Sequence, residues 1–164
     1  MLALRVLFFT LLLPGTSLVL IPWLLLRREP PARLFLLEPP RLLGLFLMAA
    51  GGAALLWCIR DFAVSGRGTL APVDPPRKLV RVGLYRYVRN PMYVAVVTAL
   101  FGEALFFESR TLGIYAGLAW LIFHSFVLLY EEPRLRDLFG ADYEAYRARV
   151  PRWIPRLRAV DAQS

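Results

Sequence analysis

The sequence has 164 residues, of which 58% are hydrophobic and 20% charged, and its 20 basic residues against 12 acidic ones give a net charge of +8. Soluble domains are about half apolar and about a quarter charged, so this chain has too few polar residues to cover a water-soluble globule, and its apolar content excludes intrinsic disorder. The single cysteine, Cys58, excludes an internal disulfide and makes a cysteine-based zinc site implausible. We therefore expect one all-α, polytopic membrane domain over residues 1–164, without a metal site or a separate soluble catalytic domain.

Four apolar runs, each about as long as a bilayer core requires, predict four transmembrane helices. The first run is followed by Arg27 and Arg28 and has no small-x-small cleavage site, so we expect a retained span rather than a signal peptide. Prolines in the two long connections end helices and stiffen the loops. The four runs cover residues 6–26, 42–59, 91–107 and 111–130.

Basic residues fall unevenly on the two sides of this four-span arrangement. One side, which holds both termini and the loop 60–90, carries 15 of the 20 basic residues, and the other side carries 5. Since Lys and Arg mark cytoplasmic loops, we expect both termini in the cytoplasm and a multi-pass protein of a bacterial or archaeal cytoplasmic membrane. The charge of +8 then reflects topology and attraction to anionic lipid headgroups, and we expect no nucleic-acid partner.

The start of the third span carries residues that suit an anionic ligand. Asn90 is a favoured N-cap residue and Pro91 fits the first helical position, so the helix is predicted to begin there. Unpaired N–H groups and the helix dipole at such a start attract a carboxylate or a phosphate. Arg86 and Arg89 precede this start and add positive charge to it.

The fourth span ends in two adjacent carboxylates. Glu131 and Glu132 are unfavourable at a helix C-terminus because they meet the negative end of the dipole and each other. Only residues 108–110 join the third and fourth spans, so these helices should be antiparallel neighbours, and their lengths bring Asn90 and Glu131 to a similar depth. We expect one spot at the membrane surface that suits a ligand with both a cation and a carboxylate.

The same residues also allow a structural interpretation. The arginines and glutamates could be interfacial ion pairs that fix the topology, and Tyr93 and Tyr130 could belong to an aromatic belt. Ionisable groups inside a membrane are candidates for function. His124 shares a helical face with Glu131 and could line the site, or it could be a histidine bonded to a neighbouring helix. Glu103 lies near the far end of its helix and is expected to face the external interface.

After Pro133, apolar residues at helical spacing alternate with charged ones. This pattern predicts an amphipathic interfacial helix and a membrane anchor over residues 134–155. The segment could be a membrane foot, and its position directly after the two glutamates also suits a lid that shields the site from water.

Three motifs carry a resemblance to a known family. They are Arg89-Asn90-Pro91-x-Tyr93, Glu131-Glu132-Pro133 and Val150-Pro151-Arg152-Trp153. With a hairpin of two spans between the first two motifs, the sequence resembles the isoprenylcysteine carboxyl methyltransferase and phospholipid methyltransferase family of integral membrane enzymes, over roughly residues 60–155. The resemblance implies that the first two motifs hold S-adenosylmethionine on the cytosolic side. The usual histidine of the family is Asn90 here, which cannot act as a base or carry a charge.

Position in the chain and the resemblance together give the expected site residues. The glutamates would engage the ammonium or the ribose hydroxyls of the cofactor, while Arg89 and the helix start would take its carboxylate. The expected catalytic residues are Arg89, Asn90, Glu131 and Glu132. The expected cofactor-binding residues are Arg86, Arg89, Asn90, Pro91, Tyr93, His124, Tyr130, Glu131 and Glu132.

The resemblance implies an S-adenosylmethionine-dependent methyltransferase that acts on the polar head of a lipid-like or isoprenoid amphiphile, as in carboxylate O-methylation. Displacement at a sulfonium needs alignment more than it needs an acid or a base, so Asn90 is compatible with this reaction. A phospholipid N-methyltransferase is the nearest competing function. A non-catalytic membrane scaffold, a small transporter that uses Glu103 and His124, and a nicotinamide-dependent reductase related to sterol reductases are also compatible with the sequence.

Overall fold

The computed structural model describes residues 14–29, 38–61, 64 and 79–160 of the chain. Every regular element in this part is helical, as the sequence predicts, and it contains no strand. The beginning of the first apolar run and most of the loop 60–90 lie outside the described residues. In chain order the elements are the π-helix η1 (Thr16–Leu20), α2 (Ile21–Leu26), α3 (Pro39–Asp61), the 3₁₀ helix η3 (Gly83–Arg86), α4 (Pro91–Phe106), α5 (Arg110–Phe126), the π-helix η4 (Val127–Glu131) and α6 (Glu132–Arg149).

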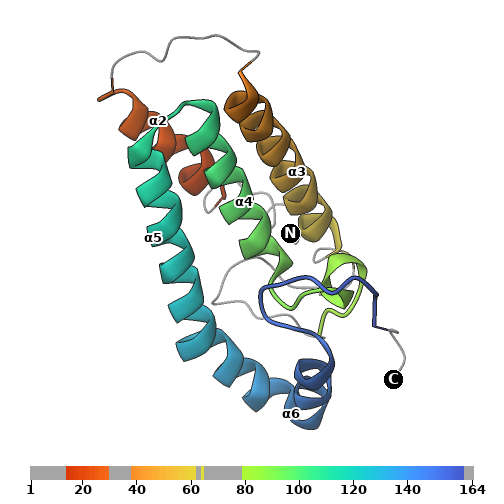
Figure 1. The fold of residues 1–164 in the computed structure, drawn as a ribbon. Helices are drawn as coiled ribbons and strands as arrows, with labels where there is room; N and C mark the ends of the chain where they lie inside the picture. The colour runs from red at the N-terminus through yellow and green to blue at the C-terminus, as the bar shows by residue number, and fades with distance from the viewer. Residues whose placement is uncertain (1–13, 30–37, 62–63, 65–78, 161–164) are drawn as a thin grey trace.

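Helices α3, α4 and α5 lie side by side, and α2 lies beside the end at which α4 turns into α5 (Figure 1). The turn between α4 and α5 is short, so these two helices are antiparallel neighbours, as predicted. Helices α5, η4 and α6 form one continuous helical stretch of 40 residues that extends beyond α4 and bends at its lower end. After α6 the chain returns toward η3 (Figure 1).

Small residues bring α3 and α4 close together. A Cβ atom on Gly44 would lie 2.7 Å from the carbonyl oxygen of Gly102, and a Cβ atom on Gly51 would lie 2.6 Å from the carbonyl oxygen of Ala95. A larger side chain at either glycine would have to displace a backbone, so the two helices meet through their main chains. This contact fixes α4, and with it the residues at the start of α4.

Within the described ranges, two helices are long and apolar enough to cross a membrane: α3 and the continuous stretch Arg110–Arg149. At 1.5 Å per residue the second would be about 60 Å long, about twice the thickness of a bilayer core. Its apolar run ends at Tyr130, and the part from Glu131 onward carries the charged residues of this stretch. The segment Thr16–Leu26 and α4 are shorter apolar helices, and the count of four spans stays a prediction.

The structure places Glu103 inside the bundle. Its side chain is buried, with the residue 7% exposed, and its Oε2 has no hydrogen-bond partner among the described residues. The expectation that Glu103 faces the external interface is therefore wrong. Helix α4 packs against α3 on one side and α5 on the other, so few of its positions remain outside. Cys58 is fully buried and is a core residue.

Helix α6 is kinked at Gly140, whose φ of 49° and ψ of −123° suit glycine because it has no Cβ atom. The helix ends at Arg149, and the following residues, which were predicted as the anchor, are not helical. Three apolar residues of the amphipathic pattern, Tyr143, Tyr146 and Val150, are buried together inside the protein. The position of this helix at a membrane surface stays a prediction.

Candidate functional site

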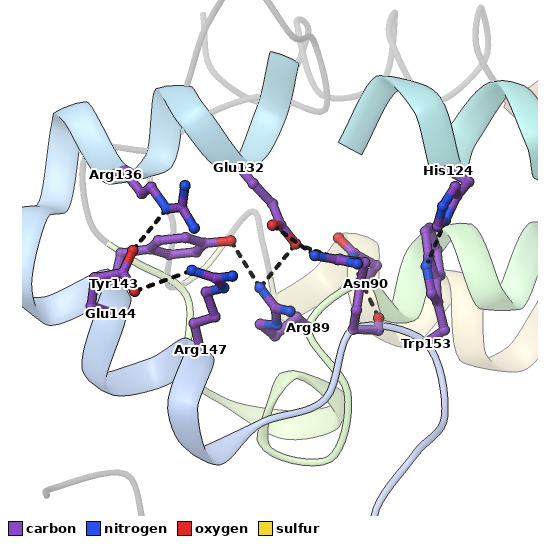
Figure 2. Close-up of polar contacts among 10 residues, drawn as sticks. Arg89, Asn90, His124, Glu132, Arg136, Tyr143, Glu144, Arg147 and Trp153 are labelled. Atoms are coloured by element: carbon purple, nitrogen blue, oxygen red, sulfur yellow. Dashed lines mark hydrogen bonds and ion pairs between the residues drawn. The ribbon is translucent and has the colours of Figure 1, made fainter. Parts of the chain in front are cut away.

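The centre of the candidate site is the carboxylate of Glu132, the first residue of α6, which lies between two arginines. Arg89 Nη1 donates to Oε1 of Glu132 at 2.9 Å (Figure 2). Arg152 binds the same carboxylate with two hydrogen bonds, from Nε to Oε1 at 2.6 Å and from Nη2 to Oε2 at 3.0 Å. The three side chains come from the loop before α4, from α6 and from the segment after α6, so the cluster forms only when these segments meet.

Burial makes this cluster electrostatically strong. The side chains of Arg89 and Glu132 are 8% and 6% exposed. Burial by itself raises the pKa of Glu132, but the hydrogen bonds from Arg152 and the charges of both arginines lower that pKa below its ordinary value. The hydrogen bond to Glu132 in turn raises the pKa of Arg152. Glu132 and Arg152 are therefore charged at neutral pH, and two guanidinium groups against one carboxylate leave a surplus of positive charge.

A second contact fixes the guanidinium of Arg89. Its Nη1 also donates to the hydroxyl of Tyr143 at 3.1 Å, and Tyr143 is buried (Figure 2). The Nε atom of Arg89 is buried too and has no hydrogen-bond partner among the described residues. A buried donor without an acceptor is unfavourable, so this N–H is free for an anionic acceptor such as a carboxylate.

Glu131, one residue earlier, has different surroundings. Its Oε2 accepts a hydrogen bond from the hydroxyl of Tyr93 at 3.0 Å. The Tyr93 ring packs against Phe123, with 4.9 Å between the ring centroids. Burial raises the pKa of Glu131, and the nearby charge of Glu132 adds to this effect, against the hydrogen bond from Tyr93, which lowers the pKa. The two adjacent glutamates therefore have pKa values that are shifted in opposite directions.

Helix α4 begins at Pro91, with Asn90 at the N-cap position, as predicted. The Asn90 side chain itself forms no capping hydrogen bond. Its Nδ2 donates instead to the carbonyl oxygen of Arg152 at 3.2 Å. The returning C-terminal segment supplies this carbonyl, and the helix start keeps its N–H groups free of that side chain.

The segment after α6 runs along the loop before α4. The backbone N–H of Arg89 donates to the carbonyl of Pro151 at 2.8 Å. The Nε of Arg86 donates to the carbonyl of Val160 at 2.7 Å. The structure thus gives Arg86, an expected cofactor-binding residue, a partner in the C-terminal segment, and its role toward a cofactor stays a prediction.

His124 forms a separate group with two tryptophans. Trp153 Nε1 donates to Nδ1 of His124 at 3.0 Å, and the rings of Trp120 and His124 stack with 5.3 Å between centroids. In Figure 2 the pair of His124 and Trp153 lies apart from Glu132, with no dashed line between the two groups. His124 is thus bonded to the segment after α6 and not to a neighbouring helix, while its role toward a cofactor stays a prediction.

Tyr130 lies in η4 and is partly exposed. It is 38% exposed, and its hydroxyl accepts a hydrogen bond from Nη1 of Arg134, one turn later, at 2.5 Å. Its contact with a cofactor stays a prediction.

The sequence assigned no site role to Arg152, Trp153 or Tyr143. The structure places each of them in a hydrogen bond with an expected site residue. The signal that would have found them is chemical: an arginine and an indole directly after an amphipathic helix, and a tyrosine on its apolar face, all carry donors that need acceptors once they are buried.

Comparisons with known proteins agree with the motifs. A family model described as phospholipid methyltransferase matches residues 40–142. The chain is 34% identical over 93 residues to methanethiol S-methyltransferase 1 of Bradyrhizobium diazoefficiens, which covers 52% of this chain and 29% of that protein. It is 35% identical over 77 residues to protein-S-isoprenylcysteine O-methyltransferase of Schizosaccharomyces pombe, and the match covers 47% of this chain and 33% of that protein. It is 39% identical over 67 residues to phosphatidylethanolamine N-methyltransferase of Malassezia globosa, and the match covers 41% of this chain and 7% of that protein.

The matched region thus spans at most 33% of the length of these three relatives. No solved structure matches the chain at a significant level. The family match includes Arg89 and both glutamates and ends before Arg152.

Proposed function

We propose a function for this chain, which belongs to the phospholipid methyltransferase family. It transfers the methyl group of S-adenosylmethionine to the polar head of a lipid-like or isoprenoid amphiphile in the membrane. The observation that carries this proposal is a pair of hydrogen bonds, Arg89 to Glu132 and Tyr93 to Glu131, which join the two motifs at the start of α4.

The residues present fit the amino-acid end of this cofactor. Arg89 has a buried N–H without an acceptor, which suits a carboxylate, and the start of α4 adds backbone N–H groups. Glu131 makes a single hydrogen bond among the described residues, from Tyr93, and has acceptor capacity left for an ammonium group. When bound, S-adenosylmethionine supplies a methyl group on a positively charged sulfur.

The contribution of the chain is to bind, to orient and to exclude water. Proximity in a water-poor site supplies much of the acceleration of a displacement reaction. Asn90 offers no base, which suits a carboxylate or thiolate acceptor because such an acceptor has no proton to lose. An amine acceptor would need a carboxylate as its base, because Asn90 has no basic group.

The membrane arrangement completes the proposal. Four spans with both termini in the cytoplasm place Arg89 and Glu131 at the cytoplasmic face, where the cofactor is made. Reporter fusions to the C-terminus and to the turn at Ser109 should report opposite sides of the membrane. The same side for both fusions would contradict the four-span topology.

The decisive experiment uses the purified full chain in detergent. S-adenosylmethionine should raise the melting temperature of the protein in a saturable way, and Glu131→Gln should weaken the binding about tenfold. Glu144→Gln, the same change at an exposed glutamate of α6, is the matched control and should leave the binding unchanged. An unchanged affinity in Glu131→Gln would reject the role of this glutamate.

Incubation with methyl-labelled cofactor and native lipids, followed by organic extraction, tests the acceptor. Label in an alkali-labile lipid ester supports O-methylation, and label in an alkali-stable phospholipid headgroup supports N-methylation. Label only in a volatile thioether after addition of methanethiol would contradict the proposal that the acceptor is an amphiphile. It would favour a small thiol as the acceptor.

A further inference from the structure

We propose that the two adjacent glutamates divide the work of cofactor binding. Glu131 contacts the ammonium group of the cofactor, whereas Glu132 contacts no ligand and acts as a positioning residue that holds Arg89 toward the carboxylate of the cofactor. Arg152 and Tyr143 complete this positioning cluster. The inference rests on the proposed function, and it assigns roles that the motif pattern does not separate.

The first argument is that the acceptor capacity of Glu132 is already used. Two arginines donate three hydrogen bonds to its two oxygens, at 2.6, 2.9 and 3.0 Å. The carboxylate is also buried, with 6% of the side chain exposed, so these hydrogen bonds take the place of water at its oxygens. An ammonium group at this position would meet two guanidinium groups that are already bound to the same oxygens, and like charges repel it.

The second argument concerns another donor of Arg89, its Nε–H. Its Nη1 is held by two acceptors, Glu132 at 2.9 Å and the Tyr143 hydroxyl at 3.1 Å, which fixes the plane of the guanidinium. The Nε–H of the same guanidinium is buried without a partner among the described residues. The side chain is 8% exposed, so water does not readily satisfy this donor. A carboxylate would satisfy it and would also balance the surplus positive charge of the cluster.

The third argument is the contrast with Glu131. Its one hydrogen bond within the described part of the chain comes from the neutral hydroxyl of Tyr93, at 3.0 Å, and no arginine binds it there. A carboxylate without a cationic partner beside a positively charged cluster is a suitable ligand for an ammonium group. The two charges of an amino acid would then lie between Glu131 and Arg89, each against the opposite sign.

The test compares two probes that differ by one group: S-adenosylmethionine, and decarboxylated S-adenosylmethionine, which keeps the ammonium and lacks the carboxylate. Binding is measured by titration of the full chain in detergent. Glu132→Gln and Arg152→Gln should each lower the affinity for S-adenosylmethionine by about tenfold. They should lower the affinity for the decarboxylated probe by less than about twofold, because only the carboxylate of the cofactor depends on Arg89. Glu131→Gln should lower the affinity for both probes by about tenfold.

Two further variants keep the test informative if Glu132→Gln fails to fold. Tyr143→Phe removes only a hydroxyl, and Arg152→Lys keeps the charge but loses the two-pronged geometry. Both should lower the affinity for S-adenosylmethionine by about threefold and leave the decarboxylated probe unchanged. Glu144→Gln, which alters a glutamate between two arginines on the exposed face of the same helix, should change neither affinity.

The outcomes separate the inference from the proposed function. If Glu132→Gln lowers the affinity for both probes equally, Glu132 contacts the ammonium group. The proposal that the two glutamates have separate roles is then overturned. Unchanged binding of both probes in Glu132→Gln and Arg152→Gln would overturn the positioning role. If the unaltered chain binds neither probe, the proposed function itself fails.

Discussion

Helix α6 carries two glutamates that each lie between two arginines, yet the two clusters differ in kind. Glu132 pairs with Arg89 and Arg152, which are 43 and 20 residues away along the chain. Glu144 pairs with Arg136 at 2.7 Å and with Arg147 at 3.3 Å, both on its own helix (Figure 2). The ion-pair distances are similar, so the number of charges and their spacing do not distinguish the two clusters.

Burial and connectivity distinguish them. The Glu132 side chain is 6% exposed, while that of Glu144 is 50% exposed. Exposed ion pairs contribute about 0–1 kcal/mol because water and salt screen them. Loss of one partner from a buried pair leaves an uncompensated charge and costs about 3–5 kcal/mol. A sequence pattern of Glu flanked by Arg therefore carries little information about function until the fold shows which cluster is enclosed.

The sharpest way to test this comparison is to make the same substitution twice. Glu132→Gln should lower the free energy of unfolding by about 3 kcal/mol, because Arg89 and Arg152 lose the carboxylate between them. The measurement is reversible unfolding of the full chain in mixed micelles. A loss as small as that in Glu144→Gln would show that the buried cluster is no stronger than the exposed one.

Acid should lower the free energy of unfolding by up to the amount that Glu132→Gln removes. The pKa of Glu132 is lower in the folded protein than its ordinary value of about 4.3, so its stabilising effect is complete above that value and is lost as the pH falls through the lower, folded-state pKa. Unfolding curves of the unaltered chain and of Glu132→Gln should therefore converge below about pH 4. A constant difference across that range would contradict the assignment.

Substitution of an arginine should have an intermediate effect. Arg152→Gln removes two hydrogen bonds but leaves Glu132 paired with Arg89, so we expect a loss of about 1–2 kcal/mol. Arg147→Gln at the exposed cluster is the matched control. Equal losses in the two variants would mean that the C-terminal segment is not held by this ion pair.

The smallest effect belongs to the exposed cluster. Glu144→Gln should change the free energy of unfolding by less than about 0.5 kcal/mol, and salt at about 0.5 M should remove what difference there is. A loss above about 1 kcal/mol would break the distinction drawn between the two glutamates.

The sequence predicted the features that depend on local signals. Pro91 begins α4, and the short turn between α4 and α5 makes these helices antiparallel, so the meeting of Arg89 with Glu132 followed from chain order and helix length. The sequence did not show that the Asn90 side chain forms no capping hydrogen bond and that its Nδ2 donates instead to a carbonyl of a distant segment. Glu103 was misplaced because the periodicity of a uniformly apolar helix does not show which side faces a neighbour.

By itself, the sequence determined a helical membrane protein and the motif pattern of its family, because apolar runs, prolines and paired carboxylates act over short distances. Only the tertiary structure decided which of two adjacent glutamates is paired with arginines. Neighbouring residues of a helix point about 100° apart, so Glu131 and Glu132 face different partners. The return of the segment after α6, which brings Arg152 to one of them, depends on packing across the whole chain.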